Sequence, residues 1–236
     1  MFQTNPFSLI ILFVGLSLLP FAAMVATSYL KIVVVISLIR NALGIQSIPP
    51  NMVVNALAMI LTFYIMAPVA SESWSIAKAE LDKSAAVASA NAVKPAASSK
   101  TFRPEELIET DALAKAAEPF RAWLLAHTSD RERSFFVHTA ENLWGKDGEP
   151  SNVDHESFYI LLPAFCVSEL TKAFQIGFLV YLPFIAIDII VSNILLAMGM
   201  MMVSPVTISL PFKLLLFVMV NGWTLLIQGL VRGYMI

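Results

Sequence analysis

The chain has 236 residues, of which 58% are hydrophobic and only 14% are charged, and its mean hydropathy is +0.75. Soluble domains contain roughly 25% charged and about 45–50% apolar residues, so this composition indicates an integral membrane protein. The net charge is −2 and no basic face is evident, which argues against nucleic acid as a partner. The single cysteine, Cys166, excludes an intrachain disulfide and a cysteine-rich metal site.

Residues 1–70 are predicted to form a first apolar helical hairpin. The stretch 7–30 is long enough to cross a bilayer, which takes about 20 residues, and the apolar sequence continues to residue 39. One straight helix of this length would be too long for a single crossing. We therefore expect either a kink at Pro20 or an extension beyond the hydrocarbon, followed by a short turn at residues 41–51 and a second span.

Residues 71–157 are predicted to be a soluble helical segment. They hold ten basic and fifteen acidic residues, whereas the rest of the chain is net positive. This asymmetry favours a position of the segment on the outer side of the membrane. The Ala/Ser-rich stretch 77–100 is expected to be a mobile linker or a frayed helix. Two or three short helices are expected after Pro104, the last ending near Gly145.

Residues 158–236 are predicted to form a second apolar helical block, which gives about four spans in the whole chain. Five charged side chains interrupt the predicted spans: Lys31, Glu169, Lys172, Asp188 and Lys213. A charge at the centre of a membrane helix costs about 2.5–3.5 kcal/mol on insertion scales, so together they would cost on the order of 10 kcal/mol in lipid. These side chains must therefore pair, extend to the interface, or face protein or water.

Glu169 and Lys172 are three residues apart and can meet on one helical face. Three explanations of the five charges are open. The side chains could pair within helices and extend to the span ends, they could pair between subunits, or they could form a proton or ion relay. The prolines in the same segments favour an assembly, because the backbone groups of a broken helix need partners that lipid cannot supply. We predict an oligomer in which the five residues are candidate inter-subunit or buried charge pairs.

Four methionines lie within five positions: Met198, Met200, Met201 and Met202. On a helix such a cluster would point in all directions, so the spacing fits a loop better than a packed stripe. Gly199 and Pro205 would let the backbone leave the helix on either side. From the residues alone, the filling of a helical core remains the alternative.

No constellation of catalytic residues is evident, and we expect neither an enzyme nor a bound cofactor or metal. The three histidines, which lack the close helical spacing of a paired ligand site, are interpreted as surface or loop residues: His127, His138 and His155. An ion-coupled transporter is a further alternative, but such proteins usually contain an inverted repeat, and none is visible.

Two long stretches and one shorter one resemble a known family. Residues 29–68, beginning "YLKIVVVISLIRNALG", and residues 162–223, including "SELTKAFQIGFLVYLPF" and "LLAMGMMMVSPV", closely resemble the FliP/SctR proteins of type III secretion. Residues 119–141 resemble the soluble segment of that family more loosely. The first residues lack the positive region of a cleavable signal peptide, which flagellar members typically have, and this favours the injectisome branch over the flagellar one.

The resemblance implies an all-α membrane protein of apolar helical hairpins with a small helical soluble segment, assembling into a homopentameric ring. The ring would belong to the export gate in the bacterial inner membrane, raised towards the periplasm and in contact with membrane lipid. It would assemble with SctS/FliQ-like and SctT/FliR-like small membrane proteins and pass unfolded polypeptides. In the family a methionine-rich loop forms a gasket across the pore, and it matches Met198 and Met200 to Met202 here. Methionine is apolar and pliable, and a ring of such side chains could exclude water from a narrow bore.

Overall fold

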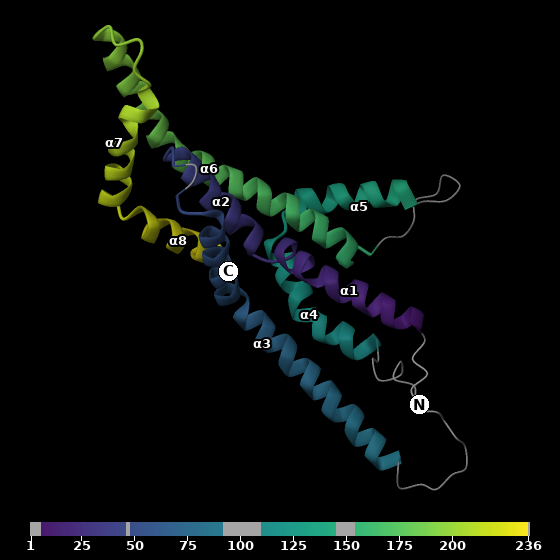
Figure 1. Ribbon diagram of the computed structural model, residues 1–236. Helices are drawn as coiled ribbons and strands as arrows, with labels where there is room; N and C mark the ends of the chain where they lie inside the picture. Colours follow the sequence, from purple (N-terminus) through teal and green to yellow (C-terminus); the bar gives the residue numbers. More distant parts are fainter. Residues whose placement is uncertain (1–5, 46–47, 92–109, 145–153, 236) are drawn as a thin grey trace.

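The computed structural model describes residues 6–45, 48–91, 110–144 and 154–235, and every regular element within these ranges is an α-helix (Figure 1). The helices are α1 (Pro6–Val25), α2 (Tyr29–Ala42), α3 (Asn51–Asn91), α4 (Thr110–His127), α5 (Asp130–Trp144), α6 (Phe158–Ala197), α7 (Pro205–Met219) and α8 (Gly222–Arg232). The all-α fold class predicted from the sequence is confirmed.

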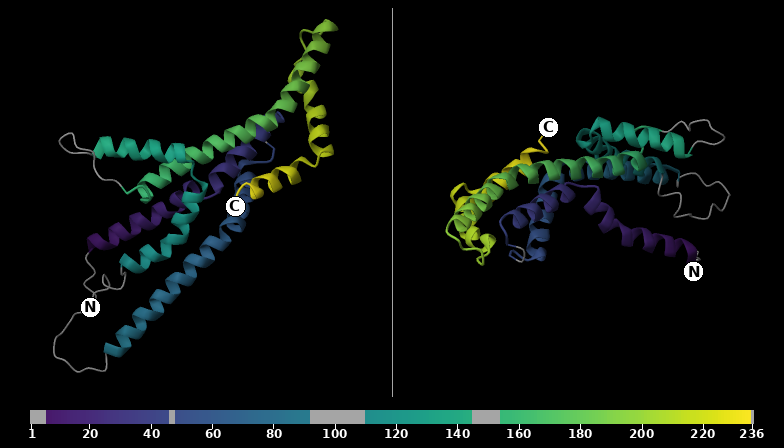
Figure 2. Two further views of the ribbon diagram at one scale, coloured as in Figure 1. Left: turned by 180° about the vertical axis from the view of Figure 1, so that it is seen from behind. Right: turned by 90° about the horizontal axis from the view of Figure 1, so that it is seen from above.

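Helix α6, with 40 residues, is the central element of the molecule. Its first half packs against α4 and α5, α2 lies along its middle, and its last turns extend beyond them together with α7 (Figures 1 and 2). The main core lies between α2 and α6, where Ile32 and Ile36 are completely buried beside Ala173. A side chain at Gly177 would lie 2.3 Å from Leu38, so glycine at this position lets the two helices approach closely.

Helices α7 and α8 return from the far end of α6 towards the body of the molecule, and we call this pair the arm (Pro205–Arg232). Figure 1 shows the arm and α6 as the sides of a triangle. The arm bends by 60° between its two helices, where Asn221 adopts a left-handed conformation with φ +52°. A side chain on Gly222 would lie 2.3 Å from the ring of Phe217, so the elbow is closely packed.

The first bend of the chain lies farther along than expected. Helix α1 continues through Pro20 to Val25, and the break falls at residues 26–28, where the axes of α1 and α2 differ by 57°. The hydroxyl of Thr27 donates to the carbonyl of Ala23 at 2.7 Å and so competes for the acceptor that a continuing helix would use. The turn expected at residues 41–51 lies between α2 and α3.

Helix α3 runs past the predicted end of the second span without interruption, as far as Asn91. The boundary drawn at residue 70 therefore falls inside a helix. Residues 77–91 follow the frayed-helix alternative rather than the linker, because alanine favours helix strongly. The remainder of the Ala/Ser-rich stretch, and the helix start expected after Pro104, lie outside the described residues. Helix α5 ends at Trp144, close to the expected Gly145.

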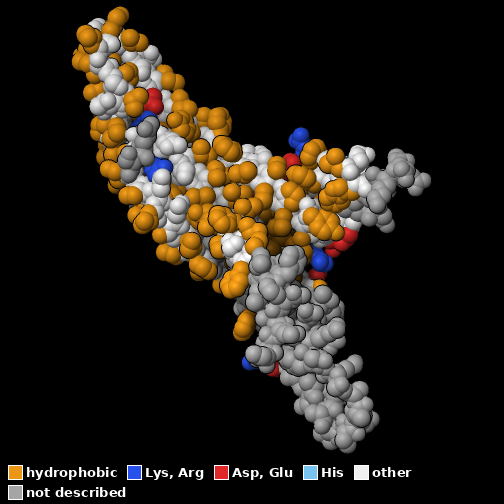
Figure 3. Space-filling view, turned by 45° about the vertical axis from the view of Figure 1, so that its right-hand side comes forward, with side chains coloured by type: hydrophobic (Ala, Val, Ile, Leu, Met, Phe, Trp, Pro, Cys, Tyr) orange, Lys and Arg blue, Asp and Glu red, His pale blue; other side chains and the backbone are white. Residues whose placement is uncertain are grey.

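The described residues contain two helices that are individually long and apolar enough to cross a membrane, in α3 and α6. Up to four spans result if the bent pairs α1–α2 and α7–α8 are each counted as one. Among the described side chains on the face drawn in Figure 3, hydrophobic ones predominate and charged ones are few. The exposed apolar surface requires lipid or other protein chains as its surroundings.

Candidate functional site

The four clustered methionines lie in the loop between α6 and α7, at the far tip of the molecule (Figure 1). We call residues 198–204 the methionine-rich loop. The methionine side chains are largely exposed: Met198 66%, Met200 40%, Met201 81% and Met202 101%. They therefore do not fill a core within the described part of this chain.

The backbone at the end of α6 explains how the loop forms. Gly199 has φ +73°, its amide donates to the carbonyl of Leu196, and the amide of Met200 donates to that of Leu195, each at 3.0 Å. This is the helix-ending motif in which glycine takes the left-handed position. Pro205 begins α7, where its missing N–H costs nothing. The two residues expected to shape the loop therefore lie at its two ends.

The second notable feature is a buried charged cluster in the body, centred on Glu169 of α6. Its carboxylate is fully buried and lies 3.0 Å from the ammonium of Lys31 in α2 and 3.1 Å from that of Lys172. Lys172 also donates to the carbonyl of His127 at 2.6 Å. The i, i+3 pair expected on α6 thus forms, and Lys31 joins it from another helix.

Two members of this cluster were missed by sequence reasoning. The hydroxyl of Tyr234, two residues from the end of the chain, donates to Glu169, and Lys31 lies 3.5 Å from the centre of the Tyr234 ring. His127 was interpreted as a surface or loop residue, and this is wrong, because it is buried beside Trp123 and Tyr234. Neither position carries a local pattern that reveals such distant contacts.

The environment of His127 disfavours its protonation. Burial lowers the pKa of the imidazole below its ordinary value, more than the hydrogen bond to the carbonyl of Trp123 and the nearby Glu169 raise it. Nδ1 lies 2.8 Å from that carbonyl oxygen, which fits the tautomer that carries its proton on Nδ1. Nε2 is buried and has no hydrogen-bond partner within the described residues. The other two histidines, His138 and His155, are exposed as expected.

A smaller charged group fixes the arm to the body. The ammonium of Lys213 in α7 lies 2.7 Å from the carboxylate of Asp188 in α6 and donates to the carbonyl of Ala42 at 3.1 Å. Ser209 donates to the same carboxylate at 2.6 Å. All five charged residues singled out in the sequence therefore have partners within one chain, in two separate groups.

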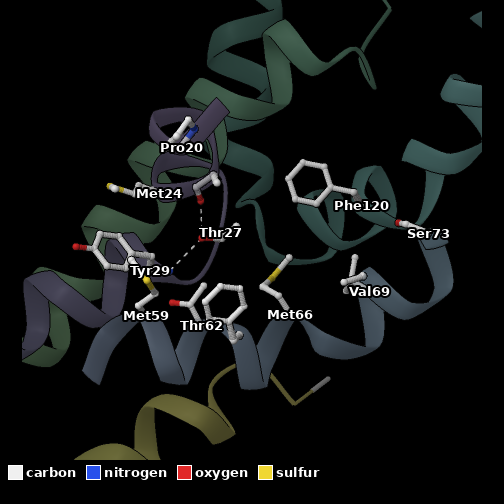
Figure 4. A pocket seen from close by; sticks show the side chains of 13 residues that line it. Pro20, Met24, Thr27, Tyr29, Met59, Thr62, Met66, Val69, Ser73 and Phe120 are labelled. Carbon is white, nitrogen blue, oxygen red and sulfur yellow. Dashed lines mark hydrogen bonds between the residues drawn. The ribbon is translucent and has the colours of Figure 1, made fainter. Parts of the chain in front are cut away.

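An apolar pocket of about 470 Å³ lies where the α1–α2 break meets α3 and α4 (Figure 4). Met24, Met59, Met66 and Phe120 are among its lining residues. The hydroxyl of Thr62 faces the pocket, but it already donates a hydrogen bond to the carbonyl of Ala58. The pocket is thus suited to packing against apolar groups rather than to chemistry. Within the described residues, no group of three or more His, Cys, Asp or Glu could hold a metal ion.

Comparison with known proteins agrees with this architecture. The model of the FliP family matches residues 12–230. The Yop proteins translocation protein R of Yersinia pestis is 50% identical over 227 residues, covering 96% of this chain and 95% of the relative. Virulence protein YscR of Salmonella typhimurium is 43% identical, covering 98% and 97% respectively.

The flagellar biosynthetic protein FliP of Pectobacterium carotovorum is 39% identical over 227 residues, covering 95% of this chain and 77% of the relative. Proteins of this family are components of secretion apparatus rather than enzymes, and the apolar helices described above suit such a role in a membrane. The chain belongs to the FliP family of type III secretion export proteins.

Proposed function

We propose that this protein forms a homopentameric ring in the export gate of a type III secretion system, and that the methionine-rich loop is the gasket of its pore. The ring lies in the bacterial inner membrane and is raised towards the periplasm, with residues 71–157 on the periplasmic side. Unfolded polypeptides pass through it during secretion.

The observation that carries this proposal is the position of the methionine-rich loop. Its apolar side chains are exposed at the tip where α6 and α7 project beyond the body, and copies related by a rotation axis can converge there. Methionine side chains are flexible and form no directional bonds, so a ring of them can close on itself and can also deform around chains of any sequence. A closed apolar constriction excludes water and hence ions.

The partners we propose are further copies of the chain, SctS/FliQ-like and SctT/FliR-like small membrane proteins, membrane lipid and the polypeptides in transit. The extensive exposed apolar surface supports an assembly of this kind. We favour the injectisome branch, because the Yersinia and Salmonella relatives share more identity and more of their length with this chain than the flagellar relative does. Family membership favours an export gate over an ion-coupled transporter.

The native mass of the detergent-extracted protein tests the proposal directly. The chain should be expressed alone and together with the two proposed small membrane partners. We expect a closed ring of several copies that gains mass when the partners are present. A stable monomer or dimer that does not bind them would overturn the assembly on which the function depends.

A further inference from the structure

We propose that Tyr234 is a positioning residue, whose bond to Glu169 holds the arm against the body and thereby fixes the place of the methionine-rich loop. The inference rests on the pore function proposed above, because it concerns the support of the same loop. It assigns a role to the residues that follow α8, which the sequence did not suggest.

Tyr234 is buried, and its hydroxyl donates to the fully buried Glu169. Its ring stacks against Trp123 of α4 with centroids 6.0 Å apart, and the ammonium of Lys31 from α2 lies over its face. Three helices thus contact one side chain that directly follows the arm. A hydrogen bond to a charged acceptor is stronger than one between neutral groups.

The arm can transmit this restraint because its elbow is tightly packed. Gly222 lies so close to Phe217 that no side chain fits between them, and the ring of Phe217 makes an edge contact with Trp223 at 5.4 Å. Asn221 holds the left-handed turn between the two helices. A displacement of α8 is therefore passed on to α7 rather than absorbed at the bend.

A second restraint lies nearer to the loop. Lys213 bonds to Asp188 of α6 and to the carbonyl of Ala42 at the end of α2. Besides the burial of Phe217, Leu226 and Leu230 in the main core, two polar contacts hold the arm, one in α7 and one just beyond α8. The methionine-rich loop begins on the far side of the first contact. With the bond of Tyr234 removed, the arm can pivot about Lys213, and the start of α7 moves with it.

The test measures the position of the arm in full-length protein within its ring. In a Cys166→Ser background, nitroxide labels are placed on Arg131 of α5 and on either Leu225 of α8 or Thr207 of α7, all exposed. Labelled chains are diluted with unlabelled ones, and label separations are measured by pulsed electron paramagnetic resonance. Tyr234→Phe keeps the ring and removes only the hydroxyl. Tyr159→Phe is the matched control, because that ring also contacts a tryptophan but is exposed.

We expect Tyr234→Phe to raise the population of a displaced arm by about tenfold, as the loss of a hydrogen bond to a charged group implies. Both separations should then acquire a longer component, while Tyr159→Phe matches the unmodified protein. Unchanged separations, or a change at Leu225 alone, would overturn the positioning role. The separations do not depend on conductance, so a failure of the gasket function would appear in an ion-leak assay and not in this measurement.

Discussion

The ammonium of Lys31 lies 3.0 Å from the carboxylate of Glu169, and the two side chains are only 4% and 0% exposed. Charges buried this deeply are costly unless they are paired and hydrogen-bonded. Glu169 meets this requirement with three donors, from Lys31, Lys172 and Tyr234. Its removal would leave two lysines without their carboxylate.

We therefore expect Glu169→Ala to destabilise the protein by about 3–5 kcal/mol, the usual effect of breaking a buried ion pair. The matched control is Glu118→Ala, which removes an acid 58% exposed that also pairs with a base three residues away, at 3.2 Å. An exposed pair of that kind contributes about 0–1 kcal/mol. Thermal unfolding in detergent measures both variants, and equal losses of stability would contradict the central role of Glu169.

The methionine-rich loop provides the second prediction. The triple replacement of Met200, Met201 and Met202 by alanine should preserve ring assembly but make the membrane leak ions, because shorter side chains cannot fill the bore. Met52→Ala is the control, since Met52 is 83% exposed, close to the 81% of Met201, but lies on α3. Conductance of vesicles containing the ring measures the effect. If export were lost while conductance remained at the level of the unmodified protein, the loop would have a different role.

The elbow of the arm gives a third prediction. Gly222→Ala places a methyl group 2.3 Å from the Phe217 ring and should destabilise the protein by about 1–3 kcal/mol through overpacking. Gly229→Ala, in the same helix, has nothing within 4 Å of the new methyl group. That variant should be neutral or stabilising by up to about 1 kcal/mol, because alanine favours helix. Similar unfolding temperatures for the two variants would show that the Phe217 ring can move to accommodate the added methyl group, which would contradict close packing at the elbow.

The fourth prediction concerns pH. Because burial lowers the pKa of His127, the unfolded chain binds a proton there more readily than the folded protein does. The stability that this group contributes is therefore complete above its ordinary pKa of 6.5 and decreases as the pH falls below that value. The unfolding temperature should drop less on acidification in His127→Gln than in the unmodified protein. The exposed His138 provides the control, and a His138→Gln variant should behave like the unmodified chain.

Local patterns in the sequence predicted the features that depend on near neighbours. The spacing of Glu169 and Lys172 predicted their contact, and the glycine and proline around the methionines predicted a loop. Hydropathy predicted where apolar helices lie, but it could not show where α3 ends, because an alanine-rich helix remains stable after its apolar face has stopped. The partners of Lys31, Tyr234 and Lys213 are distant in sequence, and only the packing of α2 and the arm against α6 brings them together.

The length of α6 has a consequence for its surroundings. Forty residues at 1.5 Å each extend about 60 Å, whereas the hydrocarbon layer is about 30 Å thick. A tilt of the usual size cannot fit a helix of this length into the hydrocarbon layer, so about half of the helix must lie outside that layer. Apolar side chains such as Phe174 and Phe178 are exposed on this chain, and those in the emergent half need neighbouring proteins to shield them from water. The high hydrophobicity of this sequence therefore reflects both the part of the chain that lies in the lipid and the part that is covered by other protein chains.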